Sequence, residues 1–196
     1  MAAGDRARWD ARWSAPDAPA SAAPARALVE AEPFLPRAAA ARVPRVLDVA
    51  GGAGRNAVWL ARRGLDVTLA DVSPLALARA AGAAAAAGVT LRLLERDLEE
   101  GLPAGPWDAI VVVDFLHRPL FDAFPTALAP GGVLVHAQPT LRNLERHAHP
   151  GARFLVAPGE LRALARGLGV LAFAEGWVDD RHVARLVARR PAAAAV

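Results

Sequence analysis

Four aspartates stand at the ends of short apolar runs, and the first lies inside a glycine-rich turn. Asp48 leads into Ala50-Gly51-Gly52-Ala53-Gly54, while Asp71, Asp97 and Asp114 follow later apolar runs. Glycines let a ligand approach the backbone closely, and a helix that starts after the turn offers unpaired N–H groups. Because carboxylates attract cations and repel phosphate, the four acids predict a ligand with a positively charged group.

A dinucleotide is the alternative ligand for such a turn. Residues 52–57 read Gly-Ala-Gly-Arg-Asn-Ala and fit the pattern G-x-G-x-x-G/A, and Asp71 follows at about the 20-residue spacing of a ribose-binding acid. A pyrophosphate, however, would meet Asp48 within the turn itself. S-adenosylmethionine carries a sulfonium and an ammonium group and no phosphate. The acids therefore favour S-adenosylmethionine, and a dinucleotide-dependent (NAD) oxidoreductase is the less favoured alternative.

One histidine, His117, is a candidate general base. His117 lies on a turn at the expected reacting end of the sheet, where it could act as a general base for a hydroxyl acceptor. Beside Pro119 it could equally be a structural hydrogen-bond partner. His147 and His149 lie on an irregular stretch with no carboxylate at helical spacing, so we expect no metal site.

The elements that must position these residues alternate between strands and helices. We expect strands over 45–49, 65–70, 89–94, 107–113 and 133–137, helices over 5–13, 24–41, 56–63, 74–87, 119–128 and 158–166, and a final hairpin of strands 170–178 and 182–188. The helix over 24–41 is expected to be kinked or split at Pro33 and Pro36. Residues 14–24 and 138–157 lack periodicity and read as loops, the second one long enough to be functional.

This alternation predicts the fold class. It is an α/β protein with a doubly wound, mostly parallel seven-stranded sheet of the Rossmann-like type, and the C-terminal hairpin adds one antiparallel strand. In such sheets the ligand lies over the carboxyl ends of the strands, which is where the four aspartates fall. We find no internal repeat and no second core domain.

Composition bounds the remaining possibilities. The chain has 196 residues, no cysteine, no apolar run long enough to span a bilayer, and no apolar signal-peptide core after Met1. Its calculated isoelectric point near 11.0 follows from the absence of lysine, tyrosine and cysteine, since the net charge is only +3 and the arginines are dispersed. We expect a soluble cytoplasmic protein with neither a membrane nor nucleic acid as its partner.

The motifs resemble those of the class I S-adenosylmethionine-dependent methyltransferases. Residues 47–54, Leu-Asp-Val-Ala-Gly-Gly-Ala-Gly, are similar to their first motif, hydrophobic-Asp-hydrophobic-Gly-x-Gly-x-Gly. Asp71 matches the second motif and Arg96-Asp97-Leu98 the third, and the likeness extends over about residues 43–190. Ala50 replaces the first glycine, a departure that costs little provided that this residue needs no positive φ.

The resemblance implies an enzyme that transfers a methyl group from S-adenosyl-L-methionine to a small-molecule acceptor. A module that binds S-adenosylmethionine without catalysis is the alternative from another class. The resemblance implies a cofactor-binding set of Trp13, Asp48, Ala50, Gly51, Gly52, Gly54, Asn56, Asp71, Val72, Asp97, Leu98 and Asp114. His117 is the one candidate catalytic residue. The acceptor and the oligomeric state stay open.

The N-terminal segment resembles that of one particular group among these methyltransferases. Trp9 and Trp13, four residues apart, would share one face of a short helix. This segment and the chain length are similar to the small tellurite-resistance and thiopurine-methyltransferase-like group, in which such a segment folds over the cofactor as a lid. We therefore expect an N-terminal lid and helical extension over 1–42, a methyltransferase domain over 43–190 and a disordered tail over 191–196.

Overall fold

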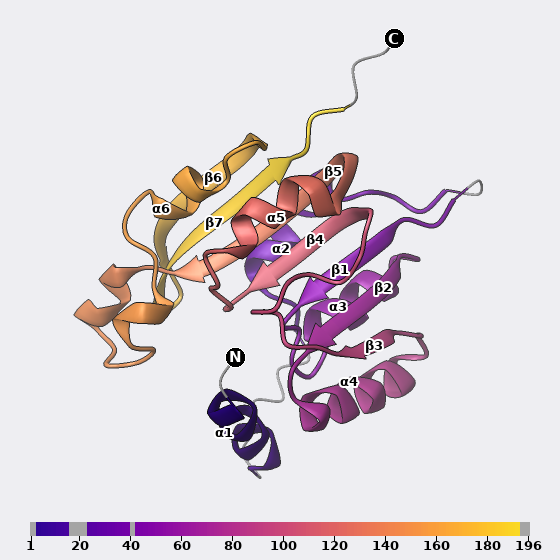
Figure 1. Cartoon of the computed structure of the whole chain (residues 1–196), viewed down its shortest axis with the longest axis horizontal. Coiled ribbons are helices and arrows are strands. Elements are labelled where there is room, and N and C mark those ends of the chain that lie inside the picture. The colour runs from indigo at the N-terminus through magenta and orange to yellow at the C-terminus, as the bar shows by residue number, and fades with distance from the viewer. Residues whose placement is uncertain (1–2, 16–22, 40–41, 193–196) are drawn as a thin grey trace.

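The computed structural model describes residues 3–15, 23–39 and 42–192. Residues 193–196 of the predicted tail over 191–196, most of the predicted loop over 14–24 and residues 40–41 of the predicted helix therefore lie outside the described residues. Within them, a single twisted sheet runs through the molecule, with helices on both faces (Figure 1). No described helix combines the length and apolarity that crossing a membrane requires.

The sheet has seven strands in the order β3-β2-β1-β4-β5-β7-β6. The strands are β1 Arg45–Val49, β2 Asp66–Asp71, β3 Arg92–Glu95, β4 Trp107–Val113, β5 Leu128–Pro139, β6 Gly169–Val178 and β7 Arg181–Arg189. Neighbours among β1 to β5 pair in parallel, and β7 is antiparallel to both β5 and β6. The predicted seven-stranded, mostly parallel fold with one reversed strand is confirmed.

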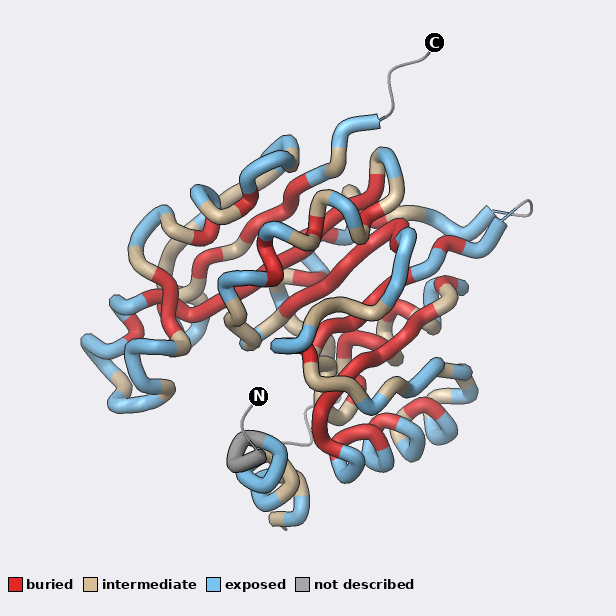
Figure 2. The backbone as a smooth tube through the Cα atoms, in the orientation of Figure 1, coloured by how far each residue is buried: buried red, intermediate tan, exposed pale blue. Residues whose placement is uncertain are grey.

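Two layers of helices bury the two faces of the sheet. The helices are α1 Ala3–Ser14, α2 Arg26–Glu30, α3 Arg55–Ala61, α4 Pro74–Ala87, α5 Leu120–Ala127 and α6 Glu160–Leu164, with short 3-10 helices η1 Glu32–Phe34, η2 Leu141–Glu145 and η3 Ala152–Phe154. One core cluster joins α2, α3 and α4 to the sheet through Leu28, Leu60 and Leu77, and the other joins α5 and α6 through Phe124 and Leu161. The strands β1, β2, β4, β5 and β7 are largely buried, whereas the edge strands β3 and β6 contain only intermediate and exposed residues (Figure 2).

Local signals define α4 as predicted. Pro74 occupies its first turn, and the Ser73 hydroxyl caps the helix by accepting a hydrogen bond from the Ala76 N–H at 3.2 Å. Gly88 ends it with φ 66°, a conformation that glycine adopts without strain. Because β2 ends directly before this cap, the position of Asp71 is fixed by a rigid strand on one side and a capped helix on the other.

The predicted helix over 24–41 is wrong in its extent. The α-helix α2 ends at Glu30, η1 contains Pro33, and the chain then runs extended towards β1. A proline has no N–H to donate and clashes with the preceding turn, so two prolines three residues apart end the helix rather than bend it.

The predicted loop over 138–157 is partly wrong. Gln138 and Pro139 extend β5, and much of the remainder forms η2 and η3. The strand also begins at Leu128 rather than at 133, because a register shift against β4 accommodates residues 130–132. Pairing with β7 carries β5 onwards to Pro139, and that partner is about 45 residues away in sequence.

Candidate functional site

The glycine turn after β1 contains three residues with positive φ. Ala50 has φ 52°, Gly52 φ 56° and Gly54 φ 84°. The condition under which Ala50 would replace glycine at little cost, that this residue needs no positive φ, is therefore not met, and a left-handed conformation brings its Cβ close to the backbone. Gly51 must lack a side chain for another reason, because a Cβ there would lie 2.7 Å from Asp48 Oδ2.

Asp71 holds this turn in place from the end of β2. Its Oδ2 accepts a hydrogen bond from the Gly52 N–H at 2.9 Å, and its Oδ1 accepts one from the Ser73 N–H at 3.0 Å. Burial raises the pKa of Asp71, and the N–H groups of Ser73 and Gly52 oppose that rise. The carboxylate therefore keeps the glycine turn against the helix start while still facing the cavity described below.

Asp48 is a buried carboxylate with no ion pair in the described part of the chain. It is 1% exposed, and no hydrogen bond of standard geometry reaches either oxygen there, although the Ala57 N–H and the Arg55 charge act on it. Burial, followed by the negative charge of Asp71, raises the pKa of Asp48 to about 7, although the Ala57 N–H and the Arg55 charge oppose the rise. A buried, unpartnered acid that lines a cavity is an environment suited to a cationic group.

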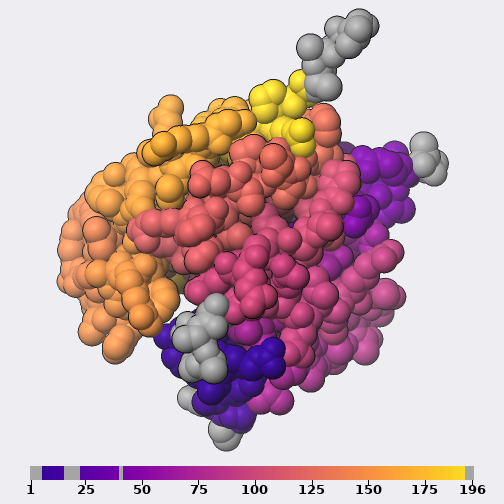
Figure 3. Space-filling view, in the orientation of Figure 1, coloured from indigo at the N-terminus to yellow at the C-terminus, as the bar shows by residue number. Residues whose placement is uncertain are grey.

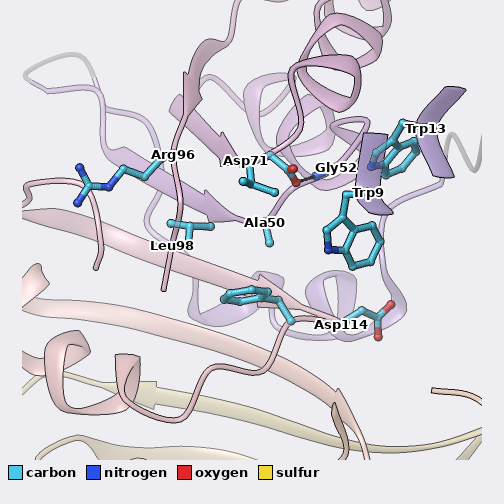
Figure 4. Close-up of a pocket in the computed structure, with 10 residues that line it drawn as sticks. Trp9, Trp13, Ala50, Gly52, Asp71, Arg96, Leu98 and Asp114 are labelled. Atoms are coloured by element: carbon cyan, nitrogen blue, oxygen red, sulfur yellow. Dashed lines mark hydrogen bonds between the residues drawn. The ribbon is translucent and has the colours of Figure 1, made fainter. Parts of the chain in front are cut away.

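A cavity lies between the glycine turn and α1, and we call it the turn cavity (Figure 4). Six of the residues around it are Trp9, Trp13, Gly52, Asp71, Leu98 and Asp114. It continues over Asp48, Arg55 and Asn56. The turn cavity thus lies over the carboxyl ends of β1, β2 and β4, where the sheet order changes direction.

A second cavity adjoins the first, and we call it the outer cavity. It has a volume of about 330 Å³ and is bounded by Trp9, Phe115, Leu116, Gln138, Pro139 and Phe154. Trp9, Asp114 and Phe115 line both cavities. A ligand in the turn cavity and one in the outer cavity would therefore meet at these three side chains.

Asp114 lies where the two cavities join, with φ 61°. Arg181, which begins β7, donates two hydrogen bonds to its carboxylate at 2.8 and 3.1 Å. Arg55 of α3 lies 3.6 Å from the same carboxylate. Two arginines from distant parts of the chain thus hold this predicted acid, so its charge is already compensated.

The helix α1 covers the turn cavity with its two tryptophans. A Cβ added to Gly52 would lie 2.8 Å from the Trp13 ring, so this indole packs directly on the glycine turn. Asp10 accepts a hydrogen bond from the Ser73 hydroxyl, and Arg6 pairs with Glu95 of β3. Figure 3 shows this N-terminal segment in indigo, packed against the surface near α4.

Most of the predicted cofactor residues come together around the turn cavity. Trp13, Ala50, Gly52, Asp71, Val72, Leu98 and Asp114 line it, and Asp48, Gly51 and Asn56 line its continuation. Gly54 lies behind the turn, where an added Cβ would be 3.0 Å from Ala80. Asn56 also ties α3 to the segment before α2, because its Oδ1 accepts a hydrogen bond from the Ala25 N–H at 2.9 Å.

Asp97 and His117, like Gly54, lie outside the sets of residues that line these cavities. Asp97 Oδ1 accepts a hydrogen bond from the Glu99 N–H at 2.9 Å, while its neighbours Arg96 and Leu98 line the turn cavity. His117 Nδ1 lies 3.9 Å from Glu99, and it is Glu99 that lines the outer cavity. No group of three or more acidic or histidine side chains suited to a metal ion occurs in the described ranges.

Sequence reasoning missed Arg55, Gln138 and Arg181. Arg181 could have been found, because an antiparallel strand beside β5 must begin at the sheet edge where the parallel strands end. That geometry brings the predicted hairpin turn to Asp114. Gln138 lies in the stretch over 138–157 that the sequence predicts to be a loop, whereas the structure places it in β5.

The chain resembles known methyltransferases in both sequence and fold. Residues 46–132 match the family described as a methyltransferase domain. The ribosomal protein L11 methyltransferase of Thermus thermophilus is 35% identical over 131 residues, 63% of this chain and 52% of that protein. The chain thus spans about half the length of that relative.

Two solved structures illustrate the likeness in fold. NodS, an N-methyltransferase from Bradyrhizobium japonicum WM9 in complex with S-adenosyl-L-homocysteine, has a TM-score of 0.68 at 18% identity, over 95% of this chain and 98% of that one. TehB from Haemophilus influenzae has a TM-score of 0.68 at 20% identity, over 83% of this chain and 61% of that one.

The match over residues 46–132 and the likeness in fold support S-adenosylmethionine as the cofactor of this domain. The residues present fit that cofactor. The buried, unpartnered Asp48 suits a positively charged group, and the side-chain-free turn at Gly51 and Gly52 leaves the backbone open to a ligand.

Proposed function

We propose that this protein transfers a methyl group from S-adenosylmethionine to a small-molecule acceptor. One observation carries the proposal: the turn cavity, with its two buried acids, opens onto a second cavity through shared side chains. A protein that only binds the cofactor needs the first cavity and not the second. Transfer needs both, because donor and acceptor must meet in line.

In the proposed complex each acid has a distinct role. Asp48 would face the ammonium group, Asp71 the ribose hydroxyls, and the segment with Asp97 and Leu98 the adenine. The cofactor, when bound, supplies an activated methyl carbon on its sulfonium sulfur. The protein contributes alignment of the acceptor with that carbon, which is the large term in such a reaction.

A calorimetric titration separates the candidate functions. We expect S-adenosylmethionine and S-adenosylhomocysteine to bind and NAD not to bind, because Asp48 and Asp71 oppose a pyrophosphate. Tight NAD binding without a response to the other two would refute the proposal. Screening of acceptors by product mass then tests catalysis, and binding without transfer over a broad panel would favour the non-catalytic module.

Asp71→Ala tests the cofactor site directly. We expect the substitution to weaken S-adenosylhomocysteine binding by roughly 1–3 kcal/mol, because hydrogen-bonding groups of the turn and the ligand lose their partner. Asp66→Ala is the matched control, since Asp66 begins the same strand and pairs with Arg92 at 3.1 Å on the exposed side. Equal affinities of the two variants by calorimetry would contradict the role of Asp71.

The role of His117 depends on the acceptor. An acceptor that attacks through sulfur, selenium, tellurium or a neutral amine needs no base, whereas a hydroxyl needs one. His117 stays the predicted base for that second case only, and its neighbour Glu99 reaches the outer cavity. A loss of activity in His117→Ala with hydroxyl acceptors, but not with thiols, would support this assignment.

We further propose membership of the tellurite-resistance and thiopurine-methyltransferase-like group. The packing of Trp13 on the glycine turn and the fold likeness to TehB support it. Residues 1–42 would then form the lid and its extension, and residues 43–190 the transferase domain. The ribosomal protein methyltransferase among the relatives makes a macromolecular acceptor the competing case, and the outer cavity, with its volume of about 330 Å³, favours a small one.

A further inference from the structure

We propose that the outer cavity binds a small apolar acceptor that donates one N–H or O–H hydrogen bond to Gln138 Oε1. This inference rests on the proposed function and names the acceptor class for it. The cavity volume of about 330 Å³ lies at the lower end of the range for small-molecule sites. Such a volume suits a one- or two-ring compound.

The boundary of the outer cavity is largely apolar. Trp9, Phe115, Leu116, Pro139 and Phe154 contribute rings or aliphatic side chains. These side chains come from α1, the segment after β4, the end of β5 and η3, so the cavity closes only when four distant segments pack together. Aromatic and proline side chains favour a flat, apolar ligand body.

The charged side chains of this cavity already have partners. Arg181 is hydrogen-bonded to Asp114. The Arg8 guanidinium lies 5.5 Å from the Trp9 ring centre and 5.4 Å from that of Phe154. The Arg12 guanidinium lies 5.9 Å from the Trp9 ring centre, and Glu99 lies 3.9 Å from His117 Nδ1. Each of the five charged side chains that line this cavity therefore already has a contact within the protein.

Gln138 differs from these groups. Its Nε2 donates a hydrogen bond of 2.6 Å to the carbonyl oxygen of Phe154, which fixes the orientation of the amide, because a carbonyl cannot accept from Oε1. The residue is 2% exposed, and Oε1 has no hydrogen-bond partner in the described ranges. A buried amide oxygen without a partner is costly. Gln138 lines the outer cavity while Oε1 itself lies just beneath its surface, so a ligand N–H or O–H beside Gln138 would satisfy this oxygen after a small shift of the side chains that cover it.

Indole and benzofuran are a matched pair of probes for this hydrogen bond. They have the same shape, but only indole has an N–H donor. With S-adenosylhomocysteine at saturation, we expect the wild-type protein to bind indole about fivefold more tightly than benzofuran, as a typical neutral hydrogen bond allows. Equal affinities, or binding of neither probe, would overturn the inference.

Two variants test whether Gln138 causes the preference for indole over benzofuran. Gln138→Leu is expected to abolish the preference for indole. Asn143→Leu is the control, because Asn143 is a buried carboxamide of the same region with an unpartnered Oδ1, yet it is not among the residues that line the outer cavity. Persistence of the preference in Gln138→Leu, or its loss in Asn143→Leu, would refute the assignment.

The binding of S-adenosylhomocysteine keeps the two proposals distinguishable. If the wild-type protein binds S-adenosylhomocysteine but shows no preference between the probes, the acceptor inference fails alone. If S-adenosylhomocysteine does not bind, the proposed function fails. The comparison of the two probes in the wild-type protein is independent of whether either variant folds.

Discussion

At the residue scale, Ala50 is a place where the turn is strained. A non-glycine residue in the left-handed region costs about 1–2 kcal/mol, and a glycine costs about 0.5–1 kcal/mol in chain entropy. With φ 52° at this position, we expect Ala50→Gly to raise the free energy of unfolding by about 0.5–1 kcal/mol. Urea denaturation measures the change.

Ala53 provides the control for that prediction. It lies in the same turn but is not among the residues with positive φ. Ala53→Gly should therefore lower the free energy of unfolding by about 0.5–1 kcal/mol, because only the entropy term operates. If both glycine variants are destabilised alike, Ala50 carries no strain.

Asp48 makes stability depend on pH in an unusual direction. Its folded-state pKa of about 7 lies above the ordinary value of 3.8. The unfolded chain releases this proton first, so the contribution of Asp48 to the free energy of unfolding falls as pH rises from about 4 to about 7. Between pH 5 and pH 7 this single group accounts for a fall of about 2 kcal/mol.

Asp48→Asn should remove that fall, because the amide does not ionise. Burial lowers the pKa of His136 to about 3, and this histidine acts in the opposite direction, since its contribution to stability is lost as pH falls below its unfolded value. It is present in both proteins, so the difference between them isolates Asp48. Urea denaturation at pH 5 and pH 7 checks this, and parallel curves for the two proteins would contradict it.

At the scale of elements, α1 is a separate piece that completes the turn cavity. It contacts the rest of the molecule through Trp13 on Gly52, through the hydrogen bond between Ser73 and Asp10, and through the ion pair of Arg6 with Glu95. We expect Trp13→Ala to weaken S-adenosylhomocysteine binding by about 1–2 kcal/mol, because one wall of the cavity loses its apolar surface.

Trp59→Ala is the matched control for Trp13→Ala. Trp59 lies in α3, where the Arg63 guanidinium stacks on its ring at 3.4 Å, and it does not line the turn cavity. Calorimetry should find near wild-type affinity for this variant. An unchanged affinity in Trp13→Ala would show that α1 takes no part in cofactor binding.

At the scale of the whole molecule, the elements whose bounds the sequence predicts correctly are those that short-range sequence features determine. The strands β1 and β4 are buried apolar runs, and α4 has a serine cap, a first-turn proline and a terminal glycine, so their bounds agree with the structure. The turn with Asp48 and Asp71 was likewise readable, because its residues are nearly contiguous with strand ends.

Distant pairing explains what the sequence could not predict. Gln138 joins β5 only because β7 lies beside it, and Arg181 reaches Asp114 only because β7 is reversed. The positive φ of Ala50 follows from the packing of the turn against β2, which no propensity encodes. Each missed feature needed a contact between segments that are far apart in the chain.

The sheet order also constrains the timing of assembly during synthesis. The strand β6 precedes β7 in the chain, but it lies at the edge of the sheet and pairs with β7 alone. The strand β7 lies between β6 and β5. A chain that has emerged from the ribosome only as far as residue 178 therefore has a strand with no place in the sheet and an Asp114 without Arg181. Both cavities reach their final form only after β7 has been inserted, so ligand binding by a nascent chain would report the emergence of this strand.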